Sequence, residues 1–367
     1  MSKLQELIQK FCPDGVEYKT LGDYINIYTG SQLNKRDMQS SGSYPVQNGG
    51  INISGYTELY NEEANTITIS QGGASAGHVK WMACNFYAGA HCYVVKPINN
   101  TSLNNRYLYY FLKRKEIMLM NAQYGAGIPA LNRNIVTTLS IPLPPLDVQN
   151  EIVRILDIFT SHTAELQAEL QARKEQYEYY RNKLLTFDKD DKNVKWMKLG
   201  DVCTLNRGIR VVRNDLNKNG KYPVYQNSLT PLGYYDKSNY PKNTTFIISA
   251  GAAGEIGFSK EPMWAADDCL CIICTDDLVS KYVYHYLIEH KIFLISKIRK
   301  ASIPRLSRVT IEQLPIAIPN ISEQQRIVSI LDKFEALVND LTDGLPAEIA
   351  AVQEQYEYYR NKLLTFK

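Results

Sequence analysis

The sequence predicts an α+β protein in which two globular domains are joined by two long helices that form an antiparallel coiled coil. Two observations support a pseudo-twofold internal repeat. The thirteen residues EQYEYYRNKLLTF at 175–187 recur without a change at 354–366, so the chain contains two copies of one unit. Before and within each copy, apolar residues recur at three- and four-residue spacing over about ten turns, which is typical of a long amphipathic helix.

Further matches between the halves set the predicted domain boundaries. Residues 151–159 (EIVRILDIF) match residues 326–334 (RIVSILDKF), and each match follows a proline-containing stop. Further back the resemblance thins to short anchors: Leu21-Gly-Asp23 with Leu199-Gly-Asp201, Tyr44-Pro-Val46 with Tyr222-Pro-Val224, Gln47-Asn48 with Gln226-Asn227, and Ile128-Pro129 with Ile303-Pro304. We therefore expect an N-terminal segment (1–16), a globular domain (17–140), a helical region (141–188), a second globular domain (189–316) and a second helical region (317–367).

Each helix carries a single apolar stripe, so it needs a packing partner along its length, and the nearest candidate is the other helix. A pseudo-twofold axis would make the two helices antiparallel and place the globular domains at opposite ends. The second helical region is four residues longer between its two matches, and the extra stretch includes Gly344 and Pro346. Because both residues interrupt helical hydrogen bonding, a kink or stutter is expected there.

Composition indicates a soluble, cytoplasmic protein. The chain has 367 residues and is 44% hydrophobic, which is enough for two ordinary cores. No long apolar run or signal-peptide core occurs, so no membrane association is expected. The seven cysteines are an odd number without framework spacing and predict reduced thiols. Cys269, Cys271 and Cys274 alternate with apolar residues and are expected in a buried strand, so no metal site is predicted there.

The charge is unevenly distributed along the chain. The net charge is only +3, but residues 17–140 and 195–316 together carry 27 basic and 18 acidic side chains. The helical stretches at 141–194 and 317–367 carry 12 basic and 18 acidic ones. Basic domains beside acidic helices predict a polyanion as partner of the domains and a protein as partner of the helices.

Basic and amide side chains cluster in loops of both globular domains, several of them at paired positions in the two halves. Arginine to guanine, asparagine or glutamine to adenine, and lysine or arginine to phosphate are the pairings by which proteins contact DNA. For any one of these residues a solvated surface position is the simpler interpretation, but the paired placement favours double-stranded DNA. The predicted DNA-binding residues are Lys35, Arg36, Gln47, Asn48, Asn132, Arg133, Arg207, Arg210, Arg213, Gln226, Asn227, Arg299, Lys300, Arg305 and Arg308.

The repeated segment is the predicted site for the protein partner. Coiled-coil packing explains the apolar positions of the repeat but not the identity of its polar ones. Recent gene conversion is one alternative; presentation of one surface to two identical partner molecules is the interpretation we favour. The predicted partner-binding residues are Glu175, Tyr177, Glu178, Arg181, Asn182 and Lys183 in one copy and Glu354, Tyr356, Glu357, Arg360, Asn361 and Lys362 in the other.

Sequence motifs for catalysis are absent. The glycine-rich runs at 72–77 and 251–257 lack the Lys-Ser/Thr pair of a phosphate-binding loop and the spacing of a dinucleotide site, so they are expected to be tight turns. The five histidines are scattered without the pattern of a catalytic triad or a metal site. We therefore expect a chain that is not an enzyme and that carries no cofactor or metal.

The order of basic variable domain, IPLPPLDVQNEIVRILD helix, second variable domain and IPNISEQQRIVSILD helix, each helix closing on QYEYYRNKLL, resembles the DNA-specificity subunit of type I restriction-modification systems. The resemblance covers the whole chain. It implies two target recognition domains, each reading one half of a split asymmetric DNA site. It also implies two conserved helices that form an antiparallel coiled coil and bind two copies of the modification subunit.

The resemblance further implies that chemistry resides on partner subunits. S-adenosylmethionine and the adenine methyltransferase are expected on the modification subunit, and ATP and Mg²⁺ on partner subunits that include restriction subunits. Two other classes of function stay open. A free-standing DNA-binding regulator would explain the basic loops but not the two identical segments, and a coiled-coil scaffold would explain the helices but not the basic loops.

Overall fold

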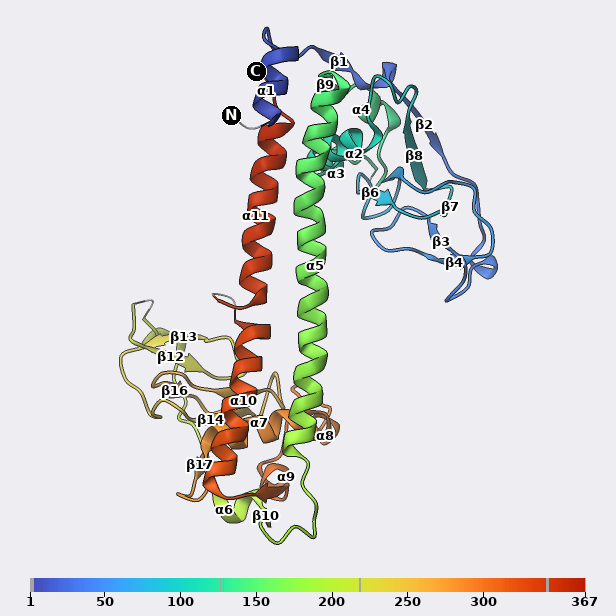
Figure 1. Ribbon diagram of the computed structural model, residues 1–367. Coiled ribbons are helices and arrows are strands. Elements are labelled where there is room, and N and C mark those ends of the chain that lie inside the picture. The colour runs from blue at the N-terminus through green and yellow to red at the C-terminus, as the bar shows by residue number, and fades with distance from the viewer. Residues whose placement is uncertain (1–2, 126, 128, 218, 341–342, 367) are drawn as a thin grey trace. The chain divides into compact units, whose positions relative to one another are not determined.

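The computed structural model describes residues 3–125, 127, 129–217, 219–340 and 343–366. The chain divides into two compact units (Figure 1). Unit 1 consists of Met1–Glu165 and Ile349–Lys367, and unit 2 consists of Leu166–Glu348. Each unit therefore combines one globular domain with parts of both helical regions. Within the part of the chain that is described, no helix is long and apolar enough to span a lipid bilayer.

The globular part of unit 1 is built on a four-stranded antiparallel sheet of order β2-β8-β5-β6. A three-stranded sheet, β4-β3-β7, and the pair β1-β9 complete it. Its elements are α1 (Lys3–Phe11), β1 (Tyr18–Thr20), η1 (Leu21–Asp23), β2 (Ile25–Thr29), η2 (Lys35–Asp37), β3 (Tyr44–Gln47), β4 (Gly55–Thr57), β5 (Thr66–Ser70), β6 (Val79–Met82), β7 (Tyr87–Ala88), β8 (Cys92–Pro97), α2 (Asn105–Arg114), α3 (Glu116–Asn121), α4 (Arg133–Thr137) and β9 (Ser140–Pro142).

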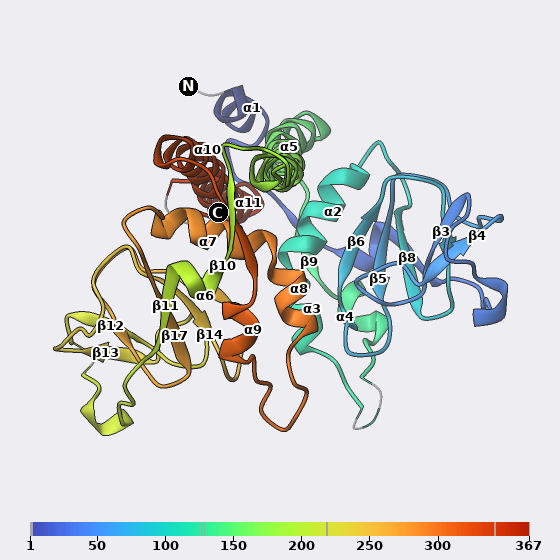
Figure 2. The ribbon, with the colours of Figure 1, turned by 90° about the horizontal axis from the view of Figure 1, so that it is seen from below.

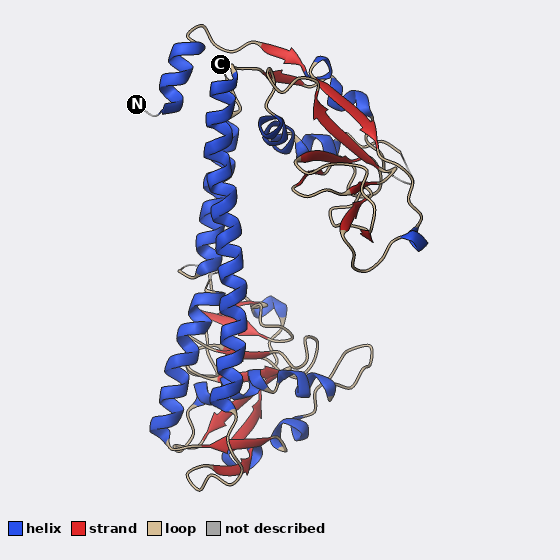
Figure 3. Ribbon diagram, turned by 45° about the vertical axis from the view of Figure 1, so that its right-hand side comes forward, coloured by secondary structure: helices blue, strands red, loops and turns tan. Residues whose placement is uncertain are grey.

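Unit 2 repeats this plan with a sheet of order β11-β17-β14-β15, a sheet β13-β12-β16 and the pair β10-β18. Its elements are β10 (Lys195–Lys198), α6 (Leu199–Val202), β11 (Cys203–Arg207), η3 (Arg213–Asp215), β12 (Tyr222–Tyr225), β13 (Gly233–Tyr235), β14 (Thr245–Ile248), β15 (Ile256–Phe258), β16 (Trp264–Ala265), β17 (Cys269–Cys274), α7 (Ser280–Glu289), α8 (Lys291–Ser296), α9 (Arg308–Glu312), β18 (Pro315–Ile318) and α10 (Ile321–Asn339). Figure 3 shows the short strands of each unit beside its helices. The cysteines at 269–274 lie in strand β17, as predicted, and are not disulfide-bonded.

The long helices are α5 (Leu146–Leu185) and α11 (Leu345–Leu363). In unit 1 the start of α5 runs antiparallel to the end of α11, with the rings of Phe159 and Tyr359 stacked at 5.4 Å. In unit 2 the end of α5 runs antiparallel to α10, and Tyr180 stacks on Phe334 at 5.5 Å. The antiparallel pairing of the helical regions is thus present within each unit.

The predicted interruption of the second helical region is confirmed. Helix α10 ends at Asn339 and α11 begins at Leu345. A Cβ atom on Gly344 would lie 2.7 Å from the carbonyl oxygens of Ala336 and Asp340, so only glycine fits where the chain passes this close to the end of α10. Pro346 lies in the first turn of α11, where its missing N–H costs no helical hydrogen bond.

Helix α2 attaches the sheet of unit 1 to α5, and helix α7 attaches the sheet of unit 2 to α10. In Figure 2, α7 lies between the sheet of unit 2 and α10. The buried amide of Gln324 on α10 accepts from the N–H of Val279 and donates to the carbonyl oxygens of Asp277 and Pro319, all within 3 Å. Gln149 on α5 makes the same three bonds in unit 1. The glutamine shared by both helical motifs is therefore structural.

A second attachment uses a cation between aromatic rings. In unit 1 the guanidinium group of Arg106 lies 4.6 Å from the Trp81 ring and donates to Asp157 on α5 at 2.8 Å. In unit 2 the ammonium group of Lys281 lies 4.3 Å from the Phe258 ring and 3.5 Å from Asp332 on α10. Because both the cation and its carboxylate are partly buried, the pair adds to the packing of sheet against helix.

Helix α3 is held to the sheet of unit 1 by one carboxylate. Glu116 accepts from the N–H of Val79 at 2.9 Å, from Lys113 at 2.7 Å and from His78 at 2.8 Å. Burial opposes ionisation of Glu116, but these hydrogen bonds outweigh it and lower its pKa to about 2. The carboxylate therefore fixes the position of α3 at the end of α2.

Candidate nucleic-acid interface

Several of the predicted DNA-binding residues of unit 2 lie at one end of its four-stranded sheet. Strands β11 and β14 finish at this end and β17 begins there, because Arg207 is paired with Leu270 and Ile248 with Cys269. Antiparallel neighbours bring the loops that follow β11 and β14 together with the loop that precedes β17. Loops from distant parts of the sequence thus form one surface.

A hairpin adds further basic residues to this end of the sheet. The backbones of Arg299 and Arg305 are bonded to each other in both directions, at 2.9 and 3.2 Å. Arg305 also pairs with Ala250, just beyond β14. Lys300 is exposed on the same hairpin. The hairpin therefore brings Arg299, Lys300 and Arg305, which follow α8, to the sheet end where Arg207 ends β11.

Asp268 lies near enough to three of the arginines to feel their charge. Its pKa is raised, chiefly by burial and then by the neighbouring Asp267, while Arg305, Arg207 and Arg210 act in the opposite direction. All three arginines are exposed. A carboxylate near exposed guanidinium groups partly balances their charge and leaves their N–H donors available to phosphate or base oxygens. Sequence inspection missed Asp268, and its place before the buried β17 strand gave no signal.

The remaining predicted residues of unit 2 have different surroundings. Asn227 is exposed and Gln226 partly buried, and both border the same sheet end, where the carbonyl oxygens of Gln226 and Asn227 accept from Cys269 and Ala252. Arg308 begins α9 and donates to Glu312 at 2.6 Å. The side chain of Arg213 lies outside the described part of the structure. Each of these residues keeps its role as a prediction.

Unit 1 has the same framework with different side chains. The paired backbones of Tyr124 and Ala130 occupy the places of Arg299 and Arg305. Lys35 and Arg36 are exposed in η2, the counterpart of η3. The exposed Arg133 donates to the carbonyl oxygen of Ile27 at 3.2 Å. At equivalent places the two units thus present different hydrogen-bonding groups, with more basic charge on unit 2.

The structure corrects the prediction for Gln47, whereas Asn132 has an internal partner but stays exposed. Gln47 is 1% exposed; its amide accepts from Lys80 at 3.1 Å and donates to Gly50 at 2.6 Å, so it is a buried structural residue here. Asn132 is exposed but caps α4 by accepting from the N–H of Asn134 at 2.9 Å. The partly exposed Asn48 accepts from the N–H of His91 at 3.2 Å.

The alignment of Gln47-Asn48 with Gln226-Asn227 was also wrong. Val46 pairs with Tyr87 in unit 1, and Val224 pairs with Trp264 in unit 2. In the structure Gln47 is therefore equivalent to Tyr225, whereas the sequence match made it equivalent to Gln226. Short identical dipeptides in loops carry too little information to fix a register.

The two copies of the repeated segment pack in opposite units. Residues 175–185 lie in unit 2 and residues 354–366 in unit 1. Each copy therefore contacts the globular part that precedes the other helical region. Tyr177 is buried against Phe334 in unit 2, and Tyr356 is partly buried against Tyr110 in unit 1. This burial contradicts the prediction that Tyr177 contacts a partner protein.

Some of the identical polar residues have internal partners and others are exposed, and Asn182 is both. Arg181 donates to Glu289 at 2.8 Å, and Asn182 donates to the same carboxylate at 3.0 Å. Arg360 is partly buried, and its Nε atom has no hydrogen-bond partner. Internal contacts thus explain part of what the sequence assigned to a partner. Of the predicted partner-binding residues, those exposed are Glu175, Glu178, Asn182 and Lys183 in one copy and Glu354, Glu357, Asn361 and Lys362 in the other.

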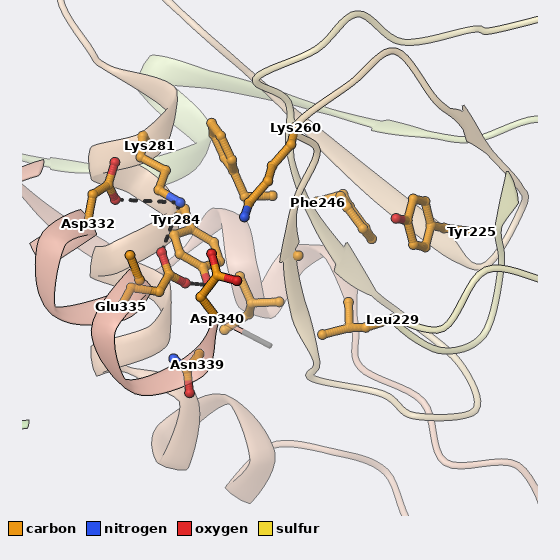
Figure 4. Close-up of a pocket in the computed structure, with 14 residues that line it drawn as sticks. Tyr225, Leu229, Phe246, Lys260, Lys281, Tyr284, Asp332, Glu335, Asn339 and Asp340 are labelled. Carbon is orange, nitrogen blue, oxygen red and sulfur yellow. Dashed lines mark hydrogen bonds and ion pairs between the residues drawn. The ribbon is translucent and has the colours of Figure 1, made fainter. Parts of the chain in front are cut away.

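A cavity of about 410 Å³ in unit 2 lies between the sheet, α7 and α10. Figure 4 shows Lys281 between Asp332 and Glu335, its ammonium group 3.0 Å from Glu335. His285, Asp332 and Glu335 lie close enough together to hold a metal ion, a cluster that the sequence did not reveal. Lys281 already supplies a cation to both carboxylates, as Arg106 does to Asp157 in unit 1. The cluster is therefore best explained as the attachment of α7 to α10.

Comparison with known proteins agrees with this twofold plan. The family model described as the type I restriction modification DNA specificity domain matches residues 13–176 and again residues 191–351. A putative type I restriction enzyme specificity subunit of Haemophilus influenzae is 35% identical, with 96% of each chain covered. The EcoR124I/EcoR124II specificity subunit of Escherichia coli is 30% identical, with 100% of this chain and 97% of that protein covered.

A solved structure has the same fold. The type I restriction-modification S subunit of M. genitalium superposes with a TM-score of 0.75 at 20% identity, covering 95% of this chain and 96% of that chain. The family model matches both halves of the chain, and the two relatives align over nearly their whole length. The chain belongs to the family of type I restriction-modification DNA-specificity subunits.

Proposed function

We propose that this chain selects the DNA sequence for a type I restriction-modification complex, with each globular part reading one half of a bipartite asymmetric site. The observation that carries the proposal is the pair of equivalent sheet ends. Both have the same framework of strand ends and hairpin, but one presents Arg207, Arg299 and Arg305 where the other presents Thr29, Tyr124 and Ala130. Equivalent surfaces with different donors are suited to different base sequences.

In this proposal the chain is not a catalyst. Two modification subunits bind the helical regions and carry S-adenosylmethionine, while ATP and Mg²⁺ belong to partner subunits, including restriction subunits when these are present. The sequence motifs for methyl transfer, ATP hydrolysis and DNA cleavage are absent from this chain. Activity is therefore expected only from the assembled complex.

A domain exchange tests the division of labour. Residues 17–140 are replaced by the equivalent region of another specificity subunit, and the methylated bases are mapped by single-molecule sequencing of DNA from cells that express the complex. One half of the methylated sequence should change while the other half stays as in the parent. A change in both halves would contradict independent reading by the two units.

The same complex separates the two other classes of function. A free-standing regulator would bind its DNA sequence equally well without the modification subunit, and a scaffold would show no sequence preference with it. The proposal requires sequence-specific adenine methylation by the mixture and none by this chain alone. Methyl transfer by the isolated chain would refute the non-catalytic assignment.

A further inference from the structure

Two cysteines face each other across neighbouring strands of unit 2. Cys203 is the first residue of β11 and Cys274 is the last residue of β17. The antiparallel register places them directly opposite, and Figure 2 shows the two strands side by side. Their Sγ atoms are 3.5 Å apart. Both side chains pack against the apolar core that includes Tyr282 of α7.

The backbone hydrogen bonds show which kind of cross-strand pair this is. The N–H of Thr275 donates to the carbonyl oxygen of Val202 at 3.2 Å. The alternation of an antiparallel ladder therefore makes Cys203 and Cys274 a non-hydrogen-bonded pair, whose Cα atoms are about 4.5 Å apart. A disulfide bond joins Cα atoms that are about 4.4 to 6.8 Å apart. Joining the two sulfur atoms thus requires rotation of the side chains but no movement of the strands.

The two thiols differ in reactivity. Cys274 is partly exposed, whereas Cys203 is buried. The thiol of Cys203 donates to the sulfur of Cys274, and this hydrogen bond lowers the pKa of Cys274 against the opposing effect of burial. Because the thiolate is the nucleophilic form of cysteine, Cys274 is the better nucleophile and Cys203 is placed to react with its oxidised product.

A cavity borders this end of the sheet. Its volume is about 380 Å³, and its lining includes Val202 and Thr275, which are the chain neighbours of the two cysteines. A small oxidant in this cavity is therefore next to the residues that flank both thiols.

We propose that Cys203 and Cys274 are a reversible oxidation site, at which hydrogen peroxide converts the two thiols into a cross-strand disulfide bond. The thiolate of Cys274 attacks one peroxide oxygen; an S–O bond forms, the O–O bond breaks, and the leaving hydroxide takes up a proton to become water. Cys203 then attacks the sulfur of this sulfenic acid; the S–S bond forms, the S–O bond breaks, and a second water leaves with the proton of Cys203. Overall, two thiols lose two protons and two electrons, and one peroxide is reduced to two waters.

The disulfide bond holds the sheet of unit 2 together without blocking its proposed DNA-facing end. The two cysteines lie at one end of β11 and β17, and Arg207 lies at the other. Because the cysteines are 71 residues apart in sequence, the bond closes a long loop and disfavours the unfolded chain. Oxidation therefore stabilises unit 2 and leaves its exposed arginines available. This inference does not depend on the proposed function.

Unit 1 provides an internal control. At the equivalent place Ile25 begins β2 and pairs with Pro97, the last residue of β8. Neither of these residues can form a disulfide bond. The same chain therefore contains one sheet with the thiol pair and one without it.

Peptide mapping identifies the bond. The full-length chain is treated with increasing hydrogen peroxide, its remaining thiols are blocked, and it is digested with trypsin without reduction. Cys203 lies in the peptide 199–207 and Cys274 in the peptide 261–281, and tandem mass spectrometry should find these peptides joined. The bond should involve Cys274 and not Cys269 or Cys271, which pack in a different apolar cluster. Dithiothreitol should restore both thiols.

Hydrogen–deuterium exchange measures the effect on stability. In the oxidised parent, amides of α7 that exchange through opening of unit 2 should exchange about 100-fold more slowly, whereas those of α2 in unit 1 should not change. Cys274→Ala should lose both the bond and the protection. The control is Cys84→Ser, which removes an exposed thiol of unit 1 and should keep both.

The exposed Cys84 also reports the dose of oxidant. Oxidation of Cys84 in the parent without a bond between Cys203 and Cys274 would overturn the inference, as would a bond from Cys203 to another cysteine. A bond that leaves the exchange of α7 unchanged would also overturn it. Because the peptide map is read on the parent chain, a variant that folds poorly does not affect this outcome.

Discussion

Arg181 and Arg360 occupy the same place in identical segments, but the carboxylate that pairs with Arg181 has a basic counterpart in unit 1. In unit 2 the guanidinium group of Arg181 is paired with the carboxylate of Glu289. In unit 1 the position of Glu289 in α7 corresponds to Arg114 in α2, which donates to the carbonyl oxygen of Leu364. Replacing each arginine with alanine should therefore have unequal effects on the stability of the two units.

The expected cost of Arg181→Ala follows from burial of the ion pair. The two side chains are 16% and 19% exposed and their charged atoms are 2.8 Å apart. Exposed pairs contribute about 0 to 1 kcal/mol, whereas breaking a fully buried pair costs about 3 to 5 kcal/mol. For this intermediate burial we expect a loss of about 2 kcal/mol, because Glu289 is left without its cation.

Arg360→Ala should cost less. The substitution removes a cation near the Tyr356 ring, at 5.2 Å, which is worth about 0.5 to 1 kcal/mol. It also removes the buried Nε atom that has no partner and a positive charge in the unit that carries Arg114. These gains offset the loss, so the net change should be below about 1 kcal/mol.

Hydrogen–deuterium exchange at increasing urea concentration measures the two effects separately. Peptides from α7 report on unit 2 and peptides from α2 report on unit 1, and their sequences differ, unlike those of the repeated segment itself. A double-mutant cycle of Arg181→Ala with Glu289→Ala isolates the pair energy. Equal losses for the two arginine variants, or a pair energy near zero, would refute the reasoning.

Three further outcomes follow from the contacts described above. Gln324→Leu should destabilise unit 2 by about 2 to 5 kcal/mol in urea denaturation because it leaves three backbone groups, in buried or partly buried hydrogen bonds, without their partner. Gln313→Leu, at an exposed position, should change little. Glu116 has a pKa of about 2 against an ordinary 4.5. Its contribution to the free energy of unfolding, at most about 3 kcal/mol, should be present above pH 4.5 and disappear as the pH falls through 2. Glu116→Gln should flatten this loss of stability in acid, and an unchanged pH dependence would contradict the assignment. Arg210→Ala should weaken DNA binding by the complex by about 1 to 3 kcal/mol if Arg210 contacts a base, or reduce the salt dependence of binding if it contacts phosphate. The control is Lys242→Ala, because Lys242 is exposed and precedes the opposite end of β14. Equal effects of the two substitutions would count against the proposed interface.

The sequence alone determined the twofold plan and the helices. An unbroken match of thirteen residues needs no knowledge of contacts, and a long apolar stripe has only one regular structure that places it on one side. Gly344 and Pro346 marked the interruption between α10 and α11, because backbone freedom and the missing N–H are local properties.

The sites followed from sequence only in part. Paired basic residues identified the loops that meet at the sheet ends, since a loop position is set by the strand before it. Burial of Gln47 could not be read in the same way: its partner Lys80 is 33 residues away. The pairing of Cys203 with Cys274 was also missed, because a strand pattern does not reveal the register with a strand 71 residues away.

Only the tertiary structure decided which globular part each repeated segment packs against. Arg181 and Glu289 are 108 residues apart in sequence, and Tyr110 and Tyr356 are further apart still. Such contacts depend on the path of the whole chain, whereas periodicity and propensity describe only neighbours a few residues apart. The identical segments therefore acquire different surroundings, because the surfaces on which they pack have different sequences.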